Sequence, residues 1–233
     1  MTMGENEAAR PRPAPLSLPS RVVGVGASAG GLEALERFFA NVPADSDAAF
    51  VIVQHLSPDF KSLLNEILAR RTSLPVLLVE DAMPVHANHV YVIPPKTEMI
   101  ISGGKLLLSE RERDQDLSLP IDVFFKSLAQ DCGPRAVAVV LSGGGSDGSR
   151  GARAVHEAGG MVMVQDEESA QFDGMPRAVR DGGFADWVLP PEDMPRALRE
   201  DPRITPDPAT GSHVELRQGM SAVYRVLEAE FGL

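Results

Sequence analysis

The chain has 233 residues, with 22 lysines and arginines against 33 aspartates and glutamates, so its formal net charge is −11. This acidity argues against nucleic-acid binding, which depends on cationic side chains meeting phosphates, and against a basic membrane-surface protein. The single cysteine, Cys132, excludes an intramolecular disulfide and a cysteine metal cage. We expect it to be a buried thiol in a reducing cytoplasm.

No membrane or export segment is predicted. The first twenty residues contain no apolar core flanked by basic residues, so we expect no signal peptide. The longest apolar runs are about six residues, whereas a bilayer span needs about 20. We therefore expect a soluble, cytoplasmic protein without membrane insertion.

Strand and helix signals alternate along most of the chain. Residues 1–20 are rich in proline, alanine and charge, which predicts a disordered tail. From Arg21 onward, short apolar runs alternate with segments of helical spacing. The expected elements, in chain order, are a strand at 21–28, a helix at 30–43, a strand at 48–56, a helix at 61–72, strands at 74–81 and 89–95, a hairpin within 96–109, a helix at 121–133, a strand entering a glycine-rich turn over 135–148, a helix at 150–160, a strand at 161–168, a helix at 175–183, and a final strand and helix within 185–200.

This alternation predicts an α/β fold over residues 21–200. Apolar strands separated by helices indicate a doubly wound, mostly parallel sheet with helices on both faces, and the hairpin is an antiparallel excursion. Residues 201–212 carry three prolines and a glycine, which predicts a linker. Residues 213–233 are expected to form an amphipathic helix without a core of its own.

Ser28 follows the first predicted strand within Gly26-Ala27-Ser28-Ala29-Gly30, a G-x-S-x-G pattern between a strand and a helix. The small neighbours allow a sharp turn that exposes the hydroxyl, and the helix N-terminus offers free N–H donors to an oxyanion. Local sequence alone leaves three interpretations open for Ser28: a nucleophile, part of a phosphate loop, or a helix cap.

The phosphate-loop interpretation rests on Gly24, Gly26 and Ala29, which satisfy the dinucleotide fingerprint G-x-G-x-x-A. That fingerprint requires a carboxylate about 20 residues on to bind the ribose. The sequence has Gln54 and His55 at that point. A histidine does not replace the carboxylate, and we expect no nucleotide or other cofactor.

His55 follows the buried run AFVIV and is predicted at the carboxyl end of a strand. Its imidazole has a reference pKa of about 6.5 and is suited to general base catalysis; a hydrogen-bonded structural histidine is the alternative. His86 and His89 are three residues apart in a turn-rich stretch rather than on a helix, so we expect no metal site.

Asp147 ends the glycine-rich turn that starts at Ser142. One interpretation is that it caps the helix predicted at 150–160. The other is that its carboxylate orients His55 and stabilises the charged imidazole. Because ligands bind at the carboxyl ends of parallel strands, Ser28, His55 and Asp147 together form a coherent Ser-His-Asp set.

Over roughly residues 20–200 the chain resembles a CheB-type protein-glutamate methylesterase domain. The resemblance is carried by five motifs in order: VGVGASAGGLEAL at 23–35, VIVQHLSPDF at 51–60, VYVIPP at 90–95, LSGGGSDG at 141–148 and DGMPRAV at 173–179. It implies a doubly wound α/β fold in which Ser28 is the nucleophile, His55 the base and Asp147 the orienting acid.

The resemblance also implies a reaction. Ser28 would attack a γ-glutamyl methyl ester of a chemoreceptor-like signalling protein, and an acyl-enzyme and methanol would form. We expect backbone N–H groups of Ala29, Gly144 and Gly145 to bind the oxyanion. Deamidation of glutamine is the same acyl chemistry with ammonia leaving. No cofactor or metal is implied.

The sequence departs from the family in three places. We expect the usual phospho-receiver domain to be lacking, because only about 20 residues precede the domain. Gly144 stands where many members have methionine, and Ala29 where many have threonine. QGMSAVYRVLEAEFGL at 218–233 is similar to the first helix of CheR-type methyltransferases. We therefore expect a piece of a receiver-less fusion, with fused or associated methyltransferase and kinase modules as partners.

Two further hypotheses remain beside the methylesterase. A catalytically weak or inactive signalling module would bind a receptor or kinase through the same cleft, and Gly144 and the missing receiver motivate it. A nucleotide-binding domain is disfavoured by His55.

Overall fold

The computed structural model describes residues 18–54, 63–110 and 119–201. Residues up to Arg199 belong to one compact unit, and the fold below is that of this unit. The predicted C-terminal helix and almost all of the predicted tail and linker lie outside the described residues. Within the described part of the chain, no helix combines the length and apolar character that a bilayer crossing requires.

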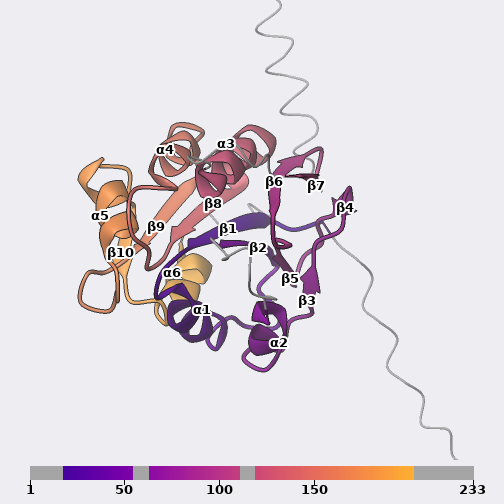
Figure 1. The fold of residues 1–233 in the computed structure, drawn as a ribbon, viewed down its shortest axis with the longest axis horizontal. Helices are drawn as coiled ribbons and strands as arrows, with labels where there is room; N and C mark the ends of the chain where they lie inside the picture. The colour runs from indigo at the N-terminus through magenta and orange to yellow at the C-terminus, as the bar shows by residue number, and fades with distance from the viewer. Residues whose placement is uncertain (1–17, 55–62, 111–118, 202–233) are drawn as a thin grey trace, which may run out of the picture. The chain divides into compact units, whose positions relative to one another are not determined.

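A seven-stranded sheet forms the centre of the domain, and every neighbouring pair in it is parallel (Figure 1). The strand order is β10-β9-β8-β1-β2-β5-β3. The strands from the first half of the chain therefore lie on one side of β1, and β8, β9 and β10 lie on the other. The strands are β1 (Arg21–Ala27), β2 (Ala48–Gln54), β3 (Val76–Leu78), β5 (His89–Val92), β8 (Ala136–Val140), β9 (Met161–Gln165) and β10 (Trp187–Leu189).

Helices cover both faces of this sheet, as predicted for a doubly wound fold. Figure 1 shows α3 and α4 on one face and α1, α2 and α6 on the other. The helices are α1 (Gly31–Phe39), α2 (Leu64–Ala69), α3 (Pro120–Cys132), α4 (Ser149–Glu157), α5 (Gly174–Asp181) and α6 (Met194–Glu200), with a short 3₁₀ turn, η1 (Gly133–Arg135), after α3.

A second, antiparallel sheet contains the predicted hairpin. β6 (Thr97–Ser102) pairs with β7 (Lys105–Glu110) around Gly103 and Gly104, both with positive φ. The two-residue β4 (Met83–Pro84) adds a third strand that the sequence did not predict. The strand predicted at 74–81 is shorter in the structure: β3 lies at the sheet edge, and Leu77 and Leu78 are exposed.

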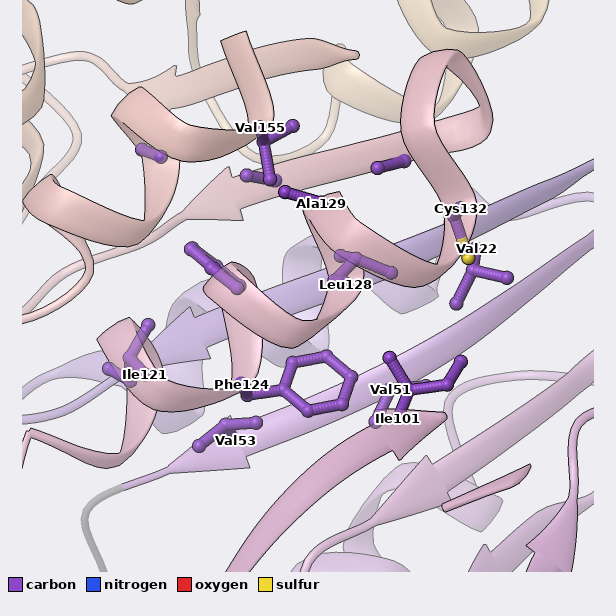
Figure 2. Packing of buried hydrophobic residues seen from close by; sticks show 14 of the residues in the cluster. Val22, Val51, Val53, Ile101, Ile121, Phe124, Leu128, Ala129, Cys132 and Val155 are labelled. Carbon is purple, nitrogen blue, oxygen red and sulfur yellow. The ribbon is translucent and has the colours of Figure 1, made fainter. Parts of the chain in front are cut away.

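The core on the α3 face depends on two glycines of β1. A Cβ on Gly24 would lie 2.8 Å from Phe125 Cε1, and one on Gly26 would lie 2.5 Å from Ile121 Cγ2. Both glycines are buried inside the strand, and their missing side chains let α3 pack closely on β1. Figure 2 shows Ile121 and Phe124 of α3 packed over the strands. Cys132, whose sulfur is in no disulfide among the described residues, is buried in the same cluster, as predicted.

Replacing Gly26 with alanine is expected to destabilise the domain by about 2 kcal/mol, because the added methyl group overlaps the Ile121 side chain and forces α3 away from β1. Gly144→Ala is the matched control, since a Cβ there meets nothing within 4 Å. Urea unfolding followed by circular dichroism measures both free energies of unfolding. Equal stability of the two variants would contradict this account of the β1 glycines.

Candidate active site

The predicted site residues follow three adjacent strands. β8, β1 and β2 are neighbours, with Gly26 paired to Val140 and Ala27 paired to Gln54. The chain therefore leaves all three strands at the same edge of the sheet. The order reverses between β1 and β8, which is the position where open α/β sheets bind ligands. His55 directly follows Gln54 in the sequence and lies outside the described residues.

Ser28 lies in the turn between β1 and α1. Its backbone N–H donates to the carbonyl of Ser142 at 3.0 Å, and its own carbonyl accepts from Gly31 N–H at 2.9 Å. The N-cap position of α1 is Gly30, with φ of 71°, so Ser28 is not the cap residue that one interpretation assumed. The Ser28 side chain is half-buried. It lies so close to the glycine loop that a Cβ on Gly143 would be 2.9 Å from Ser28 Cβ.

Ser142 joins the turn at Ser28 to the other loops at this edge. Its hydroxyl donates to the carbonyl of Ala29 at 2.8 Å and accepts from Phe172 N–H at 3.0 Å. Its backbone N–H donates to Oε1 of Gln165, a buried side chain at the end of β9, at 2.8 Å. The sequence analysis did not identify Ser142 or Gln165 as site residues, because their partners are at least 23 residues away in the chain.

The DGMPRAV motif holds the glycine loop in place. Met175 N–H donates to the carbonyl of Gly143 at 2.9 Å, and Gly143 N–H donates to the carbonyl of Phe172 at 2.9 Å. Gly143 and Gly174 have no room for a side chain, because a Cβ on Gly143 would lie 2.9 Å from Ser28 Cβ and one on Gly174 would lie 2.9 Å from Gly145 N. The motif thus fixes the loop that follows β8.

Three backbone N–H groups remain open at this edge. None of the described residues accepts a hydrogen bond from the N–H of Ala29, Gly144 or Gly145, and all three residues are exposed. Gly145 has φ of 78°, in the left-handed region that favours glycine, whereas Gly144 does not. Such groups are able to donate to a developing oxyanion.

Asp147 is buried at 3% exposure, and its carboxylate accepts three backbone hydrogen bonds. Oδ1 accepts from Asp122 N–H at 2.9 Å and from Gly148 N–H at 2.8 Å, and Oδ2 accepts from Ile121 N–H at 3.1 Å. Two of these donors are the first amides of α3. The suggestion that Asp147 caps the helix predicted at 150–160 is therefore wrong: it caps α3, and Gly148 is the N-cap residue of α4.

Asp122 is a second buried carboxyl beside Asp147. Its Oδ1 accepts from Gly151 N–H of α4 at 2.7 Å, while its Oδ2 is buried and has no hydrogen-bond partner among the described residues. Burial raises the pKa of Asp122, and the charge of Asp147 adds to the increase, while Gly151 N–H, Lys126 and Arg150 oppose it. The sequence analysis missed Asp122, because it sits inside a helical pattern.

The raised pKa of Asp122 predicts a pH-dependent stability. Because the folded-state pKa lies above the ordinary value of 3.8, the unfolded state loses its proton first, and the free energy of unfolding falls as pH rises from about 4 through the raised pKa. Asp122→Asn should lack this loss. Urea unfolding of both proteins at several pH values gives the difference curve, and parallel curves would contradict the prediction.

The histidine pair singled out in the sequence does not form a metal centre with carboxylates or thiols. His86 and His89 have ring centroids 6.1 Å apart, and His89 Nδ1 lies 2.8 Å from the carbonyl of Ala87. Across residues 18–54, 63–110 and 119–201, no group of three or more histidine, cysteine or acidic side chains is arranged to hold a metal ion.

Comparisons with known proteins agree on one family. The model of the CheB methylesterase family matches residues 23–198. An uncharacterized 104.1 kDa protein of Rhodobacter capsulatus is 54% identical over 123 residues, which are 53% of this chain and 13% of that protein. A protein-glutamate methylesterase/protein-glutamine glutaminase of Anaeromyxobacter dehalogenans is 35% identical over 179 residues, which are 77% of this chain and 52% of the relative.

A solved structure shares the fold. The crystal structure of the Thermotoga maritima CheB methylesterase catalytic domain superimposes with a TM-score of 0.71 at 32% identity, covering 77% of this chain and 97% of that domain. The chain spans about half or less of the length of the two curated relatives above. Since the family model extends from β1 into α6 and the solved catalytic domain has the same fold, this chain belongs to the CheB methylesterase family.

Proposed function

We propose that this domain hydrolyses γ-glutamyl methyl esters on chemoreceptor-like signalling proteins through Ser28, His55 and Asp147. The observation that carries the proposal is the arrangement at the carboxyl edge of β8, β1 and β2, where Ser28 and the buried Asp147 follow neighbouring strands. Membership of the CheB methylesterase family supplies the reaction class.

In the proposed reaction, Ser28 Oγ attacks the ester carbonyl carbon while His55 accepts the hydroxyl proton. The tetrahedral oxyanion accepts hydrogen bonds from the open N–H groups of Ala29, Gly144 and Gly145. His55 returns the proton to the methoxide, so methanol leaves and an acyl-enzyme remains. Water activated by His55 then releases the glutamate carboxylate. With a glutamine substrate the same steps release ammonia.

The register of the sheet supports His55 as the base. Ala27 and Gln54 are paired in neighbouring parallel strands. Ser28 directly follows Ala27 in the sequence, and His55 directly follows Gln54. An imidazole with a reference pKa of about 6.5 is able to accept and return a proton near neutral pH. His55 directly follows β2, where a dinucleotide-binding fold would need a carboxylate to bind the ribose. A histidine at this position is suited to act as a general base instead.

The environment of Asp147 supports its role as the orienting acid. A carboxylate held by three backbone N–H groups is fixed in direction. A fixed negative charge of this kind orients an imidazole and stabilises its protonated form.

A non-catalytic signalling module is the second candidate. The observation that favours it is Gly144, which is exposed and has open space where many relatives have a methionine side chain. A nucleotide-binding domain fits less well, because Gly24 and Gly26 are buried within β1 under α3 and are not part of a loop that could approach a phosphate.

Labelling with a fluorophosphonate separates these candidates. We expect one adduct per chain, located on Ser28 by peptide mass spectrometry, and slower labelling when a methylated receptor fragment is present. An unlabelled protein that still binds the fragment would favour the signalling module. Stabilisation by NAD or ATP in a thermal shift assay would favour the nucleotide-binding candidate.

We further propose that the domain works in the cytoplasm as part of a longer protein with methyltransferase or kinase modules. The support is the Rhodobacter relative, a 104.1 kDa protein of which this chain matches 13%. The segment 218–233, whose sequence is similar to the first helix of CheR-type methyltransferases, lies outside the described residues. Pull-down of the full-length protein, with identification of methyltransferase and kinase partners by mass spectrometry, would test the association.

A further inference from the structure

We infer that Asp122 is a positioning residue, which holds Asp147 in the direction that catalysis requires. The inference rests on the proposed function of Asp147 and adds a residue to it. Asp122 lies in the first turn of α3, whereas Asp147 lies just before α4, and the two carboxyls meet where the N-termini of these helices face each other.

The two helices exchange caps. Asp147, from the α4 side, accepts from the N–H groups of Ile121 and Asp122 in α3. Asp122, from the α3 side, accepts from Gly151 N–H in the first turn of α4. The hydrogen bonds therefore form a closed clasp, in which each helix start is held by a carboxylate of the other. Displacing one carboxylate releases the restraint on the second.

Close packing leaves this clasp little freedom to adjust. A Cβ on Gly151 would lie 2.5 Å from Phe125 Cβ and 3.0 Å from the Asp122 carbonyl, and a Cβ on Gly148 would lie 2.9 Å from Ile121 Cγ2. The two glycines at the start of α4 thus lie directly against Ile121, Asp122 and Phe125 of α3. Because the packing is this close, we expect a change in the Asp122 contact to move the backbone that carries Asp147.

The Asp122 carboxyl uses one of its two oxygens in this clasp. Only Oδ1 is bonded, and Oδ2 is buried without a partner among the described residues. A half-satisfied carboxyl is a costly group to bury, and a neutral acceptor would bind Gly151 N–H without that cost. The charged groups that face it are Asp147 from the neighbouring loop, Lys126 from its own helix and Arg150 from α4.

Three variants at position 122 test the inference through kcat and KM for methanol release from a methylated receptor fragment. Asp122→Asn keeps an oxygen for Gly151 N–H and should retain kcat within about threefold. Asp122→Ala removes the acceptor and should lower kcat by about tenfold or more at unchanged KM. Asp122→Ser is polar, but its side chain is too short to reach Gly151 N–H, so it should lower kcat as much as alanine does. It provides the test if the alanine variant does not fold.

Val155→Ala is the matched control, because Val155 is a buried α4 residue of the same hydrophobic cluster (Figure 2) and its apolar side chain forms no hydrogen bond in the clasp. It should lower stability and leave kcat unchanged. Full kcat in both Asp122→Ala and Asp122→Ser, or an equal loss in Val155→Ala, would overturn the positioning role.

A parallel measurement on Asp147→Asn distinguishes this inference from the proposed function. An inactive Asp147→Asn together with fully active Asp122 variants would overturn the inference alone. A fully active Asp147→Asn would overturn the proposed role of Asp147 and, with it, the role of Asp122.

Discussion

Replacing Ser28 with alanine is expected to lower methanol release by on the order of 10⁶-fold, the scale associated with removing the nucleophile of a Ser-His-Asp triad. Stability should be unchanged, because the hydrogen bonds that shape the turn, Ser28 N–H to Ser142 and Gly31 N–H to Ser28, use backbone atoms. Alanine keeps both. The measurement is the initial rate of methanol release, with urea unfolding in parallel.

Ser102→Ala is the matched control, since Ser102 is an exposed serine at the end of β6 in the other sheet. It should retain full activity. Wild-type turnover by Ser28→Ala would rule out the acyl-enzyme mechanism, and a large loss of stability in that variant would show that the hydroxyl has a structural role.

Asp147 should show two separable effects. Asp147→Ala leaves three backbone N–H groups without an acceptor in a buried position, so we expect a loss of about 3 kcal/mol in the free energy of unfolding. Asp147→Asn keeps the shape and one acceptor oxygen, and we expect a loss of about 1 kcal/mol. Both variants should lose about 10⁴-fold in kcat, because neither offers the carboxylate to the imidazole.

Asp131→Asn provides the control for these variants. Asp131 also accepts two backbone hydrogen bonds, from Gly103 and Gly104, but it lies at the β6–β7 hairpin away from the β8-β1-β2 edge. Its replacement should affect stability without changing kcat. A similar kcat for Asp147→Asn and wild type would remove Asp147 from the mechanism.

The fold was largely predictable because its signals are local. The buried runs that became β1, β2, β8 and β9 are short and uninterrupted, which is typical of strands covered on both faces. The β6–β7 hairpin was marked by its two glycines. The edge strand β3 was expected to be longer, because a run of apolar residues does not reveal which strand lies at the edge of the sheet.

The candidate site was predictable only in part. Ser28 and Asp147 were predicted as site residues because each follows a strand in the sequence. The residues that hold this site together were not predicted, because they are far away in the sequence. Asp147 accepts from amides 25 and 26 residues away, and Ser142 binds Gln165, which is 23 residues away. Gly24 and Gly26 matched a phosphate motif in the sequence, and only the contact with α3 shows that they serve helix packing.

The central position of β1 has a consequence for biosynthesis. Within this domain β1 is the first strand to be synthesised, yet its neighbour β8 begins only at Ala136, and Gln165 and Met175 follow later still. A nascent chain with β1, β2 and β5 therefore exposes one open, apolar strand edge until the second half of the domain is made. Folding of this enzyme family member should accordingly be slow and cooperative, as non-local parallel pairing requires.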